Sequence, residues 1–198
     1  DHRDLHLSIR RQRQMCIRDR YIGKHLEVNL SKKQSEELHQ CYEHIYTIIS
    51  KIPKSFMHRD FHSRNLMVTS EKNPGVLDYQ DAVIGPITYD IASLLKDCYV
   101  AWDDETIYSM TSSFFSKIEK RHEIVYDEFE YWFDITGLQR HLKAIGIFSR
   151  LNYRDNKSNY LDDIPRTLNY ITKILLKYSE LSELKRIFSE INLDNTYD

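Results

Sequence analysis

Apolar residues recur along most of this chain at the spacing of α-helices. Leu38, Tyr42, Ile45 and Ile49 fall three or four positions apart, as on one face of a helix that ends before Pro53. The same spacing returns later, and helices are expected over residues 34–51, 88–102, 104–120, 126–153, 164–178 and 181–191. The chain is therefore predicted to be mostly helical.

The segments between these helices carry turn and cap signals. Residues 82–87 contain a glycine-proline pair and are expected to form a loop. Residues 21–31 are short and mixed and are expected to form turns, with Ser31 or Ser35 as the cap of the first helix. Near Gly137 the fourth helix is expected to break, because glycine weakens a helix interior.

A β-hairpin is predicted between the first two helices. Residues 66–69 and Val76-Leu77 are apolar or β-branched runs that flank Lys72-Asn73-Pro74-Gly75. Asn, Pro and Gly favour tight turns, so the two runs are expected to pair. A hairpin would bring Asn65, before its first strand, beside Asp78, after its second.

The residues around this hairpin suggest a metal and a proton acceptor. Two oxygen ligands, from Asn65 and Asp78, suit Mg²⁺ that takes its remaining ligands from water and phosphate. Asp60 lies five residues before Asn65 and would present a carboxylate at the edge of the same point. A polar turn with scattered carboxylates is the simpler alternative, since Asp and Asn favour turns.

Residues 1–19 are interpreted as non-native. Two parts of this segment, DHRDLH and RRQRQMCIRD, match the translation of the constant parts of a sequencing adapter, with Arg20 at the junction. Residues 1–20 are therefore expected to have no fold and 21–198 to form one domain. Removing the five arginines and three aspartates of 1–19 changes the formal net charge from −2 to about −4, which does not call for nucleic acid.

The two remaining cysteines are typical of a protein in a reducing compartment. Cys41 and Cys98 show neither zinc spacing nor a disulfide framework. No apolar run approaches the length of a membrane span. We expect a cytoplasmic protein without a membrane or nucleic-acid partner, and a monomer at full length.

The stretch HRDFHSRN followed by an Asp resembles the catalytic loop of the protein-kinase-like superfamily, H-x-D-x-x-x-x-N, and its metal-binding Asp. His62 favours the aminoglycoside phosphotransferase and choline kinase branch. The resemblance implies that Asp60 orients the acceptor hydroxyl, that Asn65 and Asp78 hold Mg²⁺ against ATP, and that His58 is structural. It also implies an α+β fold, a mostly helical C-terminal kinase lobe whose hairpin carries the metal site, without the N-terminal β-rich lobe.

A narrower similarity covers Tyr21 to about Tyr178. The strings HRDFHSRNLMV, GVLDYQDAVIGPITYDIASLLKDCYVAW and GLQRHLKAIGIFSRLNYRD resemble bacterial anomeric kinases of N-acetylmuramate and N-acetylglucosamine. The similarity implies phosphorylation of the C1 hydroxyl of a cell-wall amino sugar with ATP, for peptidoglycan recycling. A chain without the N-terminal lobe is expected to be inactive by itself.

Other residues have two interpretations each. Asp90 would brace the catalytic loop in this superfamily, or simply favour the start of a helix. Asp81 would bind metal indirectly or cap the loop. The candidates for the acceptor site, which are otherwise ordinary polar residues, are His62, Arg64, Asp81, Arg140 and His141.

Two other functions stay open. A kinase for an aminoglycoside or an amino alcohol would share the same centre. A metal-dependent hydrolase is suggested by His58-x-Asp60-x-His62, although no further ligands follow at a recognisable spacing.

Overall fold

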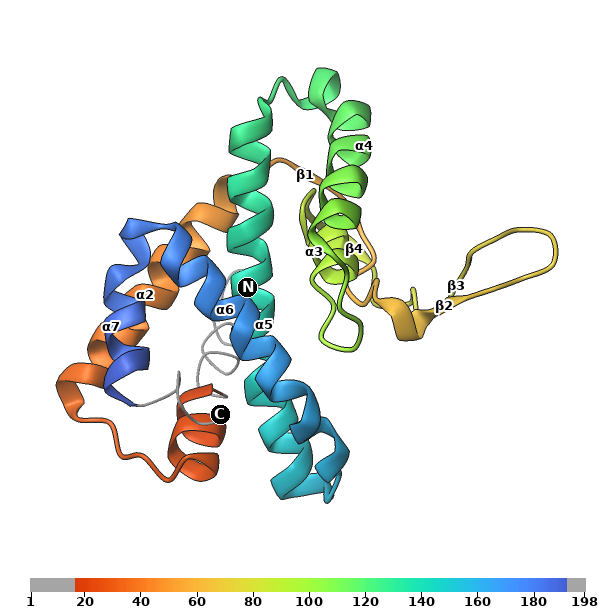
Figure 1. Cartoon of the computed structure of the whole chain (residues 1–198). Coiled ribbons are helices and arrows are strands. Elements are labelled where there is room, and N and C mark those ends of the chain that lie inside the picture. Colours follow the sequence, from red (N-terminus) through yellow and green to blue (C-terminus); the bar gives the residue numbers. More distant parts are fainter. Residues whose placement is uncertain (1–16, 192–198) are drawn as a thin grey trace, which may run out of the picture. The chain divides into compact units, whose positions relative to one another are not determined.

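The computed structural model describes residues 17–191 (Figure 1). The chain divides into two compact units. One contains the chain up to Tyr46 and again from Leu138 onward, and the other is Thr47–Gly137. Helices α2 (Lys32–Lys51) and α5 (Tyr126–Asp155) each contribute residues to both units.

The unit that contains the two ends of the chain is helical. Its further elements are the π-helix η1 (Ile17–His25), the 3-10 helices η3 (Ser158–Asp163) and η4 (Ser179–Leu181), and the α-helices α6 (Ile164–Lys177) and α7 (Ser182–Glu190). Leu38 and Ile45 of α2, Ile171 of α6 and Ile187 of α7 are fully buried, so the apolar face expected from residue spacing is the buried face of each helix.

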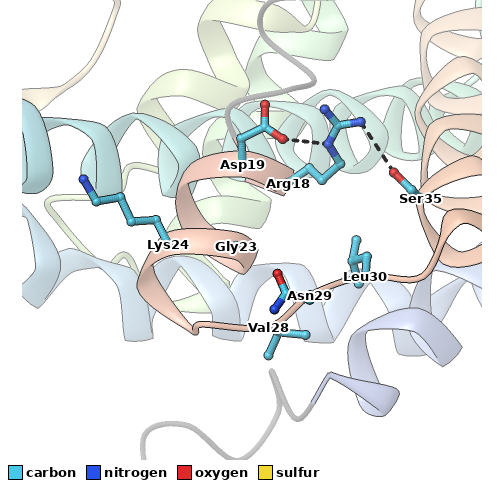
Figure 2. A pocket seen from close by; sticks show the side chains of 8 residues that line it. All are labelled: Arg18, Asp19, Gly23, Lys24, Val28, Asn29, Leu30 and Ser35. Carbon is cyan, nitrogen blue, oxygen red and sulfur yellow. Dashed lines mark hydrogen bonds and ion pairs between the residues drawn. The ribbon is translucent and has the colours of Figure 1, made fainter.

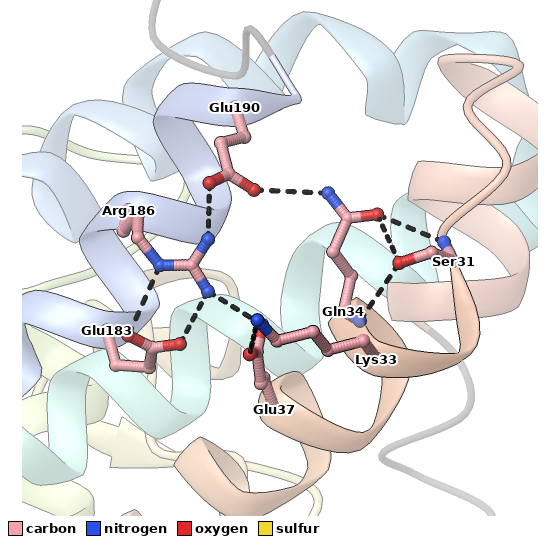
Figure 3. A network of polar contacts seen from close by, with 7 residues as sticks. All are labelled: Ser31, Lys33, Gln34, Glu37, Glu183, Arg186 and Glu190. Atoms are coloured by element: carbon pink, nitrogen blue, oxygen red, sulfur yellow. Dashed lines mark hydrogen bonds and ion pairs between the residues drawn. The ribbon is translucent and has the colours of Figure 1, made fainter.

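Polar contacts join α2 and α7 on the surface of this unit. The Arg186 guanidinium donates to Glu37 of α2, 2.6 Å away, and to Glu183 and Glu190 of its own helix (Figure 3). Gln34 also donates to Glu190 at 3.1 Å. At the start of α2, Gln34 N donates to Ser31 Oγ at 3.2 Å and Ser31 N donates to Gln34 Oε1 at 3.0 Å, a reciprocal capping box.

The unit Thr47–Gly137, called the central unit below, combines short strands with helices. Its elements are β1 (Lys54–Met57), the 3-10 helix η2 (Ser63–Asn65), β2 (Leu66–Met67), β3 (Gly75–Val76), β4 (Val83–Pro86), α3 (Tyr89–Leu95) and α4 (Asp104–His122). Ile91 and Leu95 of α3 form a core with Phe129 and Phe133 of α5. Aromatic and aliphatic residues of α4, among them Ile107, Phe114 and Phe115, pack against this core.

Strands β2 and β3 pair antiparallel, with Leu66 opposite Val76 and Met67 opposite Gly75. The resulting short hairpin extends away from α3 and α4 (Figure 1). Its turn is closed by the Thr69 hydroxyl, which donates to the Lys72 carbonyl at 2.6 Å.

Residues 83–86 form a strand, whereas the sequence predicted a loop. β4 pairs antiparallel with β1, with Lys54 opposite Pro86 and Met57 opposite Val83. A partner this distant in sequence leaves no local signal, and the glycine-proline pair is tolerated because Pro86 lies at the strand end. Gly85 leaves room for the Met57 side chain, because a Cβ there would lie 2.6 Å from the Met57 sulfur.

Helix α3 ends at Leu95, well before the predicted end at residue 102. Lys96, the next residue, is buried and its Nζ lies 2.5 Å from Asp134 Oδ1. The Asp97 carboxylate accepts from Tyr99 N at 2.9 Å, and such a local bond competes with the helix ladder. Thr88 is at the N-cap position, but its hydroxyl bonds the Thr136 hydroxyl at 2.7 Å instead of a helix N–H.

Helix α5 is unbroken through Gly137, contrary to the predicted interruption. A Cβ at this position would lie 2.6 Å from Lys96 Cδ. The glycine therefore makes room for the Lys96 side chain without interrupting the helix.

At the other end of the chain, Tyr21 to His25 are helical where turns were predicted, and Tyr21 and Ile22 are fully buried. Ile17 to Arg20 belong to this helix although no fold was expected up to residue 20. The first sixteen residues of the segment interpreted as an adapter lie outside the described residues. Between residues 17 and 191 no helix is long and apolar enough to cross a membrane.

Candidate active site

The loop between β1 and η2 is held by Asp90, at the start of α3. Asp90 Oδ2 accepts from His58 N at 2.6 Å, and Oδ1 accepts from Arg59 N at 3.1 Å. Arg59 has φ 81°, an unfavourable conformation for a residue with a Cβ. The two bonds to Asp90, with a third from Arg59 Nη1 to the Asp81 carbonyl at 3.2 Å, hold the loop in this conformation.

His58 is the first residue of the loop. Its side chain is buried, and its ring packs edge-on against Phe61 with centroids 5.8 Å apart. Neither ring nitrogen has a hydrogen-bond partner within residues 17–191. The contacts of His58 are therefore those of a packing residue.

The Asp60 carboxylate is half-buried and, in the described part of the chain, has no hydrogen-bond or ion-pair partner. Its backbone carbonyl accepts from Asn65 Nδ2 at 2.9 Å. That bond engages the amide nitrogen of Asn65 and leaves Asn65 Oδ1 as the atom able to bind a cation.

The hairpin brings the segment of Asp78 to Asn65. Leu77 N donates to the Asn65 carbonyl at 3.0 Å, directly beyond the paired strands. Asp78 has φ 66°, a left-handed conformation that Asp tolerates better than most residues. Gln80 Nε2 donates to Asp78 Oδ1, and the other carboxylate oxygen, Oδ2, receives no such bond from the described residues.

This donor set suits a hard cation that is shared with phosphate. Asn65 Oδ1 and the Asp78 carboxylate supply oxygens, which Mg²⁺ prefers, and Mg²⁺ usually completes its shell with water and substrate phosphate. Among residues 17–191 no three His, Cys, Asp or Glu side chains are grouped so that they could hold a metal by themselves.

A family model for phosphotransferase enzymes matches residues 10–122, more than half of the chain. The chain belongs to this phosphotransferase family. The match includes the loop, the hairpin and the two carboxylates just described.

Curated relatives in this family bear one name, N-acetylmuramate/N-acetylglucosamine kinase. The protein from Neisseria meningitidis is 40% identical over 174 residues, which are 86% of this chain and 52% of the relative. The proteins from Pseudomonas putida and Pseudomonas aeruginosa are 38% and 36% identical over 86% and 92% of this chain, and 51% and 54% of their own lengths. The chain thus spans about half the length of these relatives.

Two candidates for the acceptor site belong to this loop and to the 3-10 turn that follows it. The Arg64 guanidinium stacks over the Tyr99 ring, 3.6 Å from its centroid, and the His62 ring meets Tyr99 edge-on at 5.4 Å. Asp81 contacts the loop through its backbone carbonyl.

Two further candidates belong to the other unit. His141 is buried, and its ring stacks on Tyr170 with centroids 4.8 Å apart. Arg140, its neighbour in α5, is half-buried. A role in acceptor binding stays a prediction for both residues.

The unit that contains the chain ends also has an open hollow between η1 and α2 (Figure 2). Arg18 donates to its neighbour Asp19 at 2.7 Å and to Ser35 of α2 at 3.4 Å. Because Arg18 and Asp19 fall within the segment interpreted as an adapter, this hollow supports no functional assignment.

Sequence reasoning missed Asp97. This carboxylate is 2% exposed and accepts from Ser63 N, inside the catalytic loop, at 2.8 Å. Helical spacing assigned the residue to α3, and no pattern in the sequence distinguished it from other aspartates near helix ends.

Proposed function

We propose that the full-length protein containing this chain is an ATP-dependent kinase that phosphorylates the C1 hydroxyl of N-acetylmuramate or N-acetylglucosamine. Family membership and the shared name of the curated relatives support this proposal. The observation that carries it is the loop itself, where Asp60 presents a carboxylate without a partner among the described residues, five positions before Asn65.

In this proposal Asp60 orients the acceptor hydroxyl toward the γ-phosphate and accepts its proton. Phosphoryl transfer requires little covalent work from a protein, so placement and charge stabilisation account for most of the rate. Asp90 would hold the loop so that Asp60 stays in place, because it binds the two backbone N–H groups that precede Asp60.

Asn65 Oδ1 and Asp78 would hold Mg²⁺, which supplies positive charge beside the β- and γ-phosphate oxygens when ATP is bound. Asn65 is prepared for this role because its amide nitrogen is engaged by the Asp60 carbonyl. Its orientation is thus set before the cation binds.

The product would be a sugar 1-phosphate that is returned to peptidoglycan synthesis, and the reaction would take place in the cytoplasm of a bacterium. Within residues 17–191, Cys41 and Cys98 are not joined in a disulfide, which suits a reducing compartment. ATP, Mg²⁺ and one amino sugar are the partners in this proposal, with a monomer as the functional form.

The test is an acceptor panel with the full-length protein, in which release of ADP is measured. N-acetylmuramate and N-acetylglucosamine are compared with their 1-O-methyl glycosides, which differ only in lacking a free C1 hydroxyl. We expect turnover with the free sugars and none with the glycosides, and a phosphorus NMR signal of a sugar 1-phosphate.

Kanamycin and choline complete the panel. Preferential phosphorylation of either would identify a kinase of another acceptor class with the same catalytic loop. Equal turnover of the methyl glycosides would place the phosphate on a different hydroxyl. Either result would refute the proposed reaction.

A further inference from the structure

The segment that follows α3 contacts three consecutive residues of the catalytic loop. Asp97 Oδ2 accepts from Ser63 N at 2.8 Å. The Tyr99 ring stacks on the Arg64 guanidinium at 3.6 Å and meets the His62 ring edge-on at 5.4 Å. The contacts come from one short stretch of chain and cover the residues directly before Asn65.

Asp97 also sets the position of Tyr99. Its second oxygen, Oδ1, accepts from Tyr99 N at 2.9 Å. The Asp97 carboxylate thus binds both the backbone of Ser63 and the backbone of Tyr99, whose ring packs against the loop. Asp97 is 2% exposed, so water competes little for either bond, and a charge-assisted bond in such surroundings is stronger than a neutral one.

The bond to Ser63 lies within one turn of the proposed metal ligand. Ser63–Asn65 is a single 3-10 turn, and Asn65 at its end donates to the Asp60 carbonyl at 2.9 Å. Movement of Ser63 therefore displaces Asn65 and, through that bond, the backbone of Asp60. Asp90 holds the beginning of the same loop at His58 and Arg59, and Asp97 holds its end.

We propose that Asp97 is a positioning residue that sets the Asn65 ligand oxygen for the nucleotide-bound metal ion. The inference rests on the proposed function, because it assumes that Asn65 binds the metal. Asp97 touches neither the substrate nor the metal in this proposal. Its effect passes through the Ser63–Asn65 turn, as second partners of metal ligands commonly act.

The experiment measures Mn²⁺ binding to the full-length protein in the presence of ATP, by the electron paramagnetic resonance signal of free Mn²⁺. Asp97→Ala removes the acceptor of the bond, and Asp97→Asn keeps one neutral acceptor. Ser63→Pro removes the donor. Proline suits this position because Ser63 opens the 3-10 turn and His62 before it is extended, with φ −133° and ψ 170°.

The matched control is Asp103→Ala. Asp103 also accepts from a backbone N–H, that of Thr106 at 2.7 Å, but it caps α4 and has no contact with the loop. Both alanine substitutions therefore remove a carboxylate that binds a backbone donor. Thermal unfolding of the metal-free variants shows how much general stability each has lost.

We expect Asp97→Ala and Ser63→Pro to weaken Mn²⁺ binding about tenfold or more, with a smaller loss for Asp97→Asn and none for Asp103→Ala. In an Asn65→Ala background, Asp97→Ala should cause no further loss, because the two residues act through one ligand. A residue needed only for folding would instead weaken binding by the same factor in both backgrounds.

Two results would overturn the proposal. One is Mn²⁺ affinity of Asp97→Ala within about twofold of the wild type. The other is a double variant with Asn65→Ala whose loss of affinity equals the product of the two single losses. If Asp97→Ala does not fold, Asp97→Asn and Ser63→Pro decide by the same criteria. Mn²⁺ and ATP binding by a wild-type protein that phosphorylates neither amino sugar would refute the proposed substrates and leave this comparison intact.

Discussion

Asp60 and Asp78 have different surroundings, and these surroundings suit different roles. The Asp60 carboxylate is half-buried and has no partner in the described part of the chain, so it is available to a hydroxyl. Asp78 is exposed at the end of the hairpin, in a left-handed conformation, where a carboxylate can reach a solvated cation. Substitution of Asp60 should therefore mainly lower turnover, and substitution of Asp78 should mainly weaken nucleotide binding.

Asp60→Asn in the full-length protein should lower kcat about 10²- to 10⁴-fold, the usual contribution of a general base. The apparent affinity for Mg·ATP should stay close to that of the wild type, because the metal ligands are untouched. Steady-state kinetics with varied ATP measures both quantities, with Asp104→Asn as a distant control. A kcat equal to that of the wild type would refute the role of Asp60.

Asp78→Asn should abolish detectable Mg·ATP binding in calorimetry, because the proposed metal site loses the carboxylate ligand that we assign to it. Asn is preferred to Ala here since it tolerates the left-handed conformation of Asp78. Asp81→Ala should leave binding unchanged, because Asp81 contacts the loop through its backbone. Unchanged nucleotide binding in Asp78→Asn would count against the metal site.

Lys96 and Asp134 form a buried ion pair with 8% of each side chain exposed. Asp134→Ala removes the carboxylate from a buried ammonium and should cost about 3–5 kcal/mol of unfolding free energy. The double variant Lys96→Met, Asp134→Leu should recover most of this loss, since an apolar pair needs no charge compensation. Urea unfolding tests both, and a double variant no more stable than Asp134→Ala would contradict the expectation.

At the scale of elements, the contact between α2 and α7 depends on charge. Arg186 donates to Glu183, which lowers the pKa of that carboxyl, and bonds from Gln34 and Arg186 lower the pKa of Glu190. Carboxyls with lowered pKa in the folded state stabilise it above their ordinary pKa of 4.5 and lose this effect as the pH falls through the lowered values.

Arg186→Ala should therefore lower the unfolding midpoint at pH 7, and the difference from the wild type should disappear as the pH falls through the lowered pKa values of Glu183 and Glu190. High salt should also reduce the difference, because these side chains are exposed. Lys185→Ala, which removes the same charge from the neighbouring position, should lack this pH dependence. A difference that persisted at low pH would show that Arg186 acts through packing instead.

At the scale of the whole molecule, apolar side chains gather on the strands of the central unit. Phe56 on β1 and Ile84 on β4 are opposite one another in register and are 67% and 71% exposed. Directly opposed residues lie on one face of a sheet, so the two form a continuous apolar surface. Exposed apolar surface of this kind commonly marks an interaction site or an aggregation hazard.

Since the chain spans about half the length of its curated relatives, we expect the rest of a full-length protein to cover this face. The 198-residue chain alone should show no sugar kinase turnover and should bind the dye ANS. Phe56→Thr with Ile84→Thr should reduce dye binding and light scattering, whereas Val125→Thr, at a position 66% exposed but away from the strands, should not. Robust turnover by the chain alone would contradict this expectation.

Several helices and the family could be predicted from the sequence because their determinants are local. Apolar spacing of three and four predicts α2, α4 and α6 closely, since one helical turn brings those positions to one face. The turn residues between Thr69 and Gly75 likewise indicate a hairpin. The family could be predicted because its loop signature is contiguous.

Tertiary structure alone decided the features that depend on partners distant in sequence. β4 exists because β1 pairs with it, α3 ends where Lys96 meets Asp134, and Gly137 within α5 leaves room for the Lys96 side chain. Asp97 could likewise be recognised as a positioning residue only from the tertiary structure. A buried carboxylate becomes distinctive only when folding brings the Ser63 N–H to it, because hydrogen bonds between distant segments leave no periodic signal in the sequence.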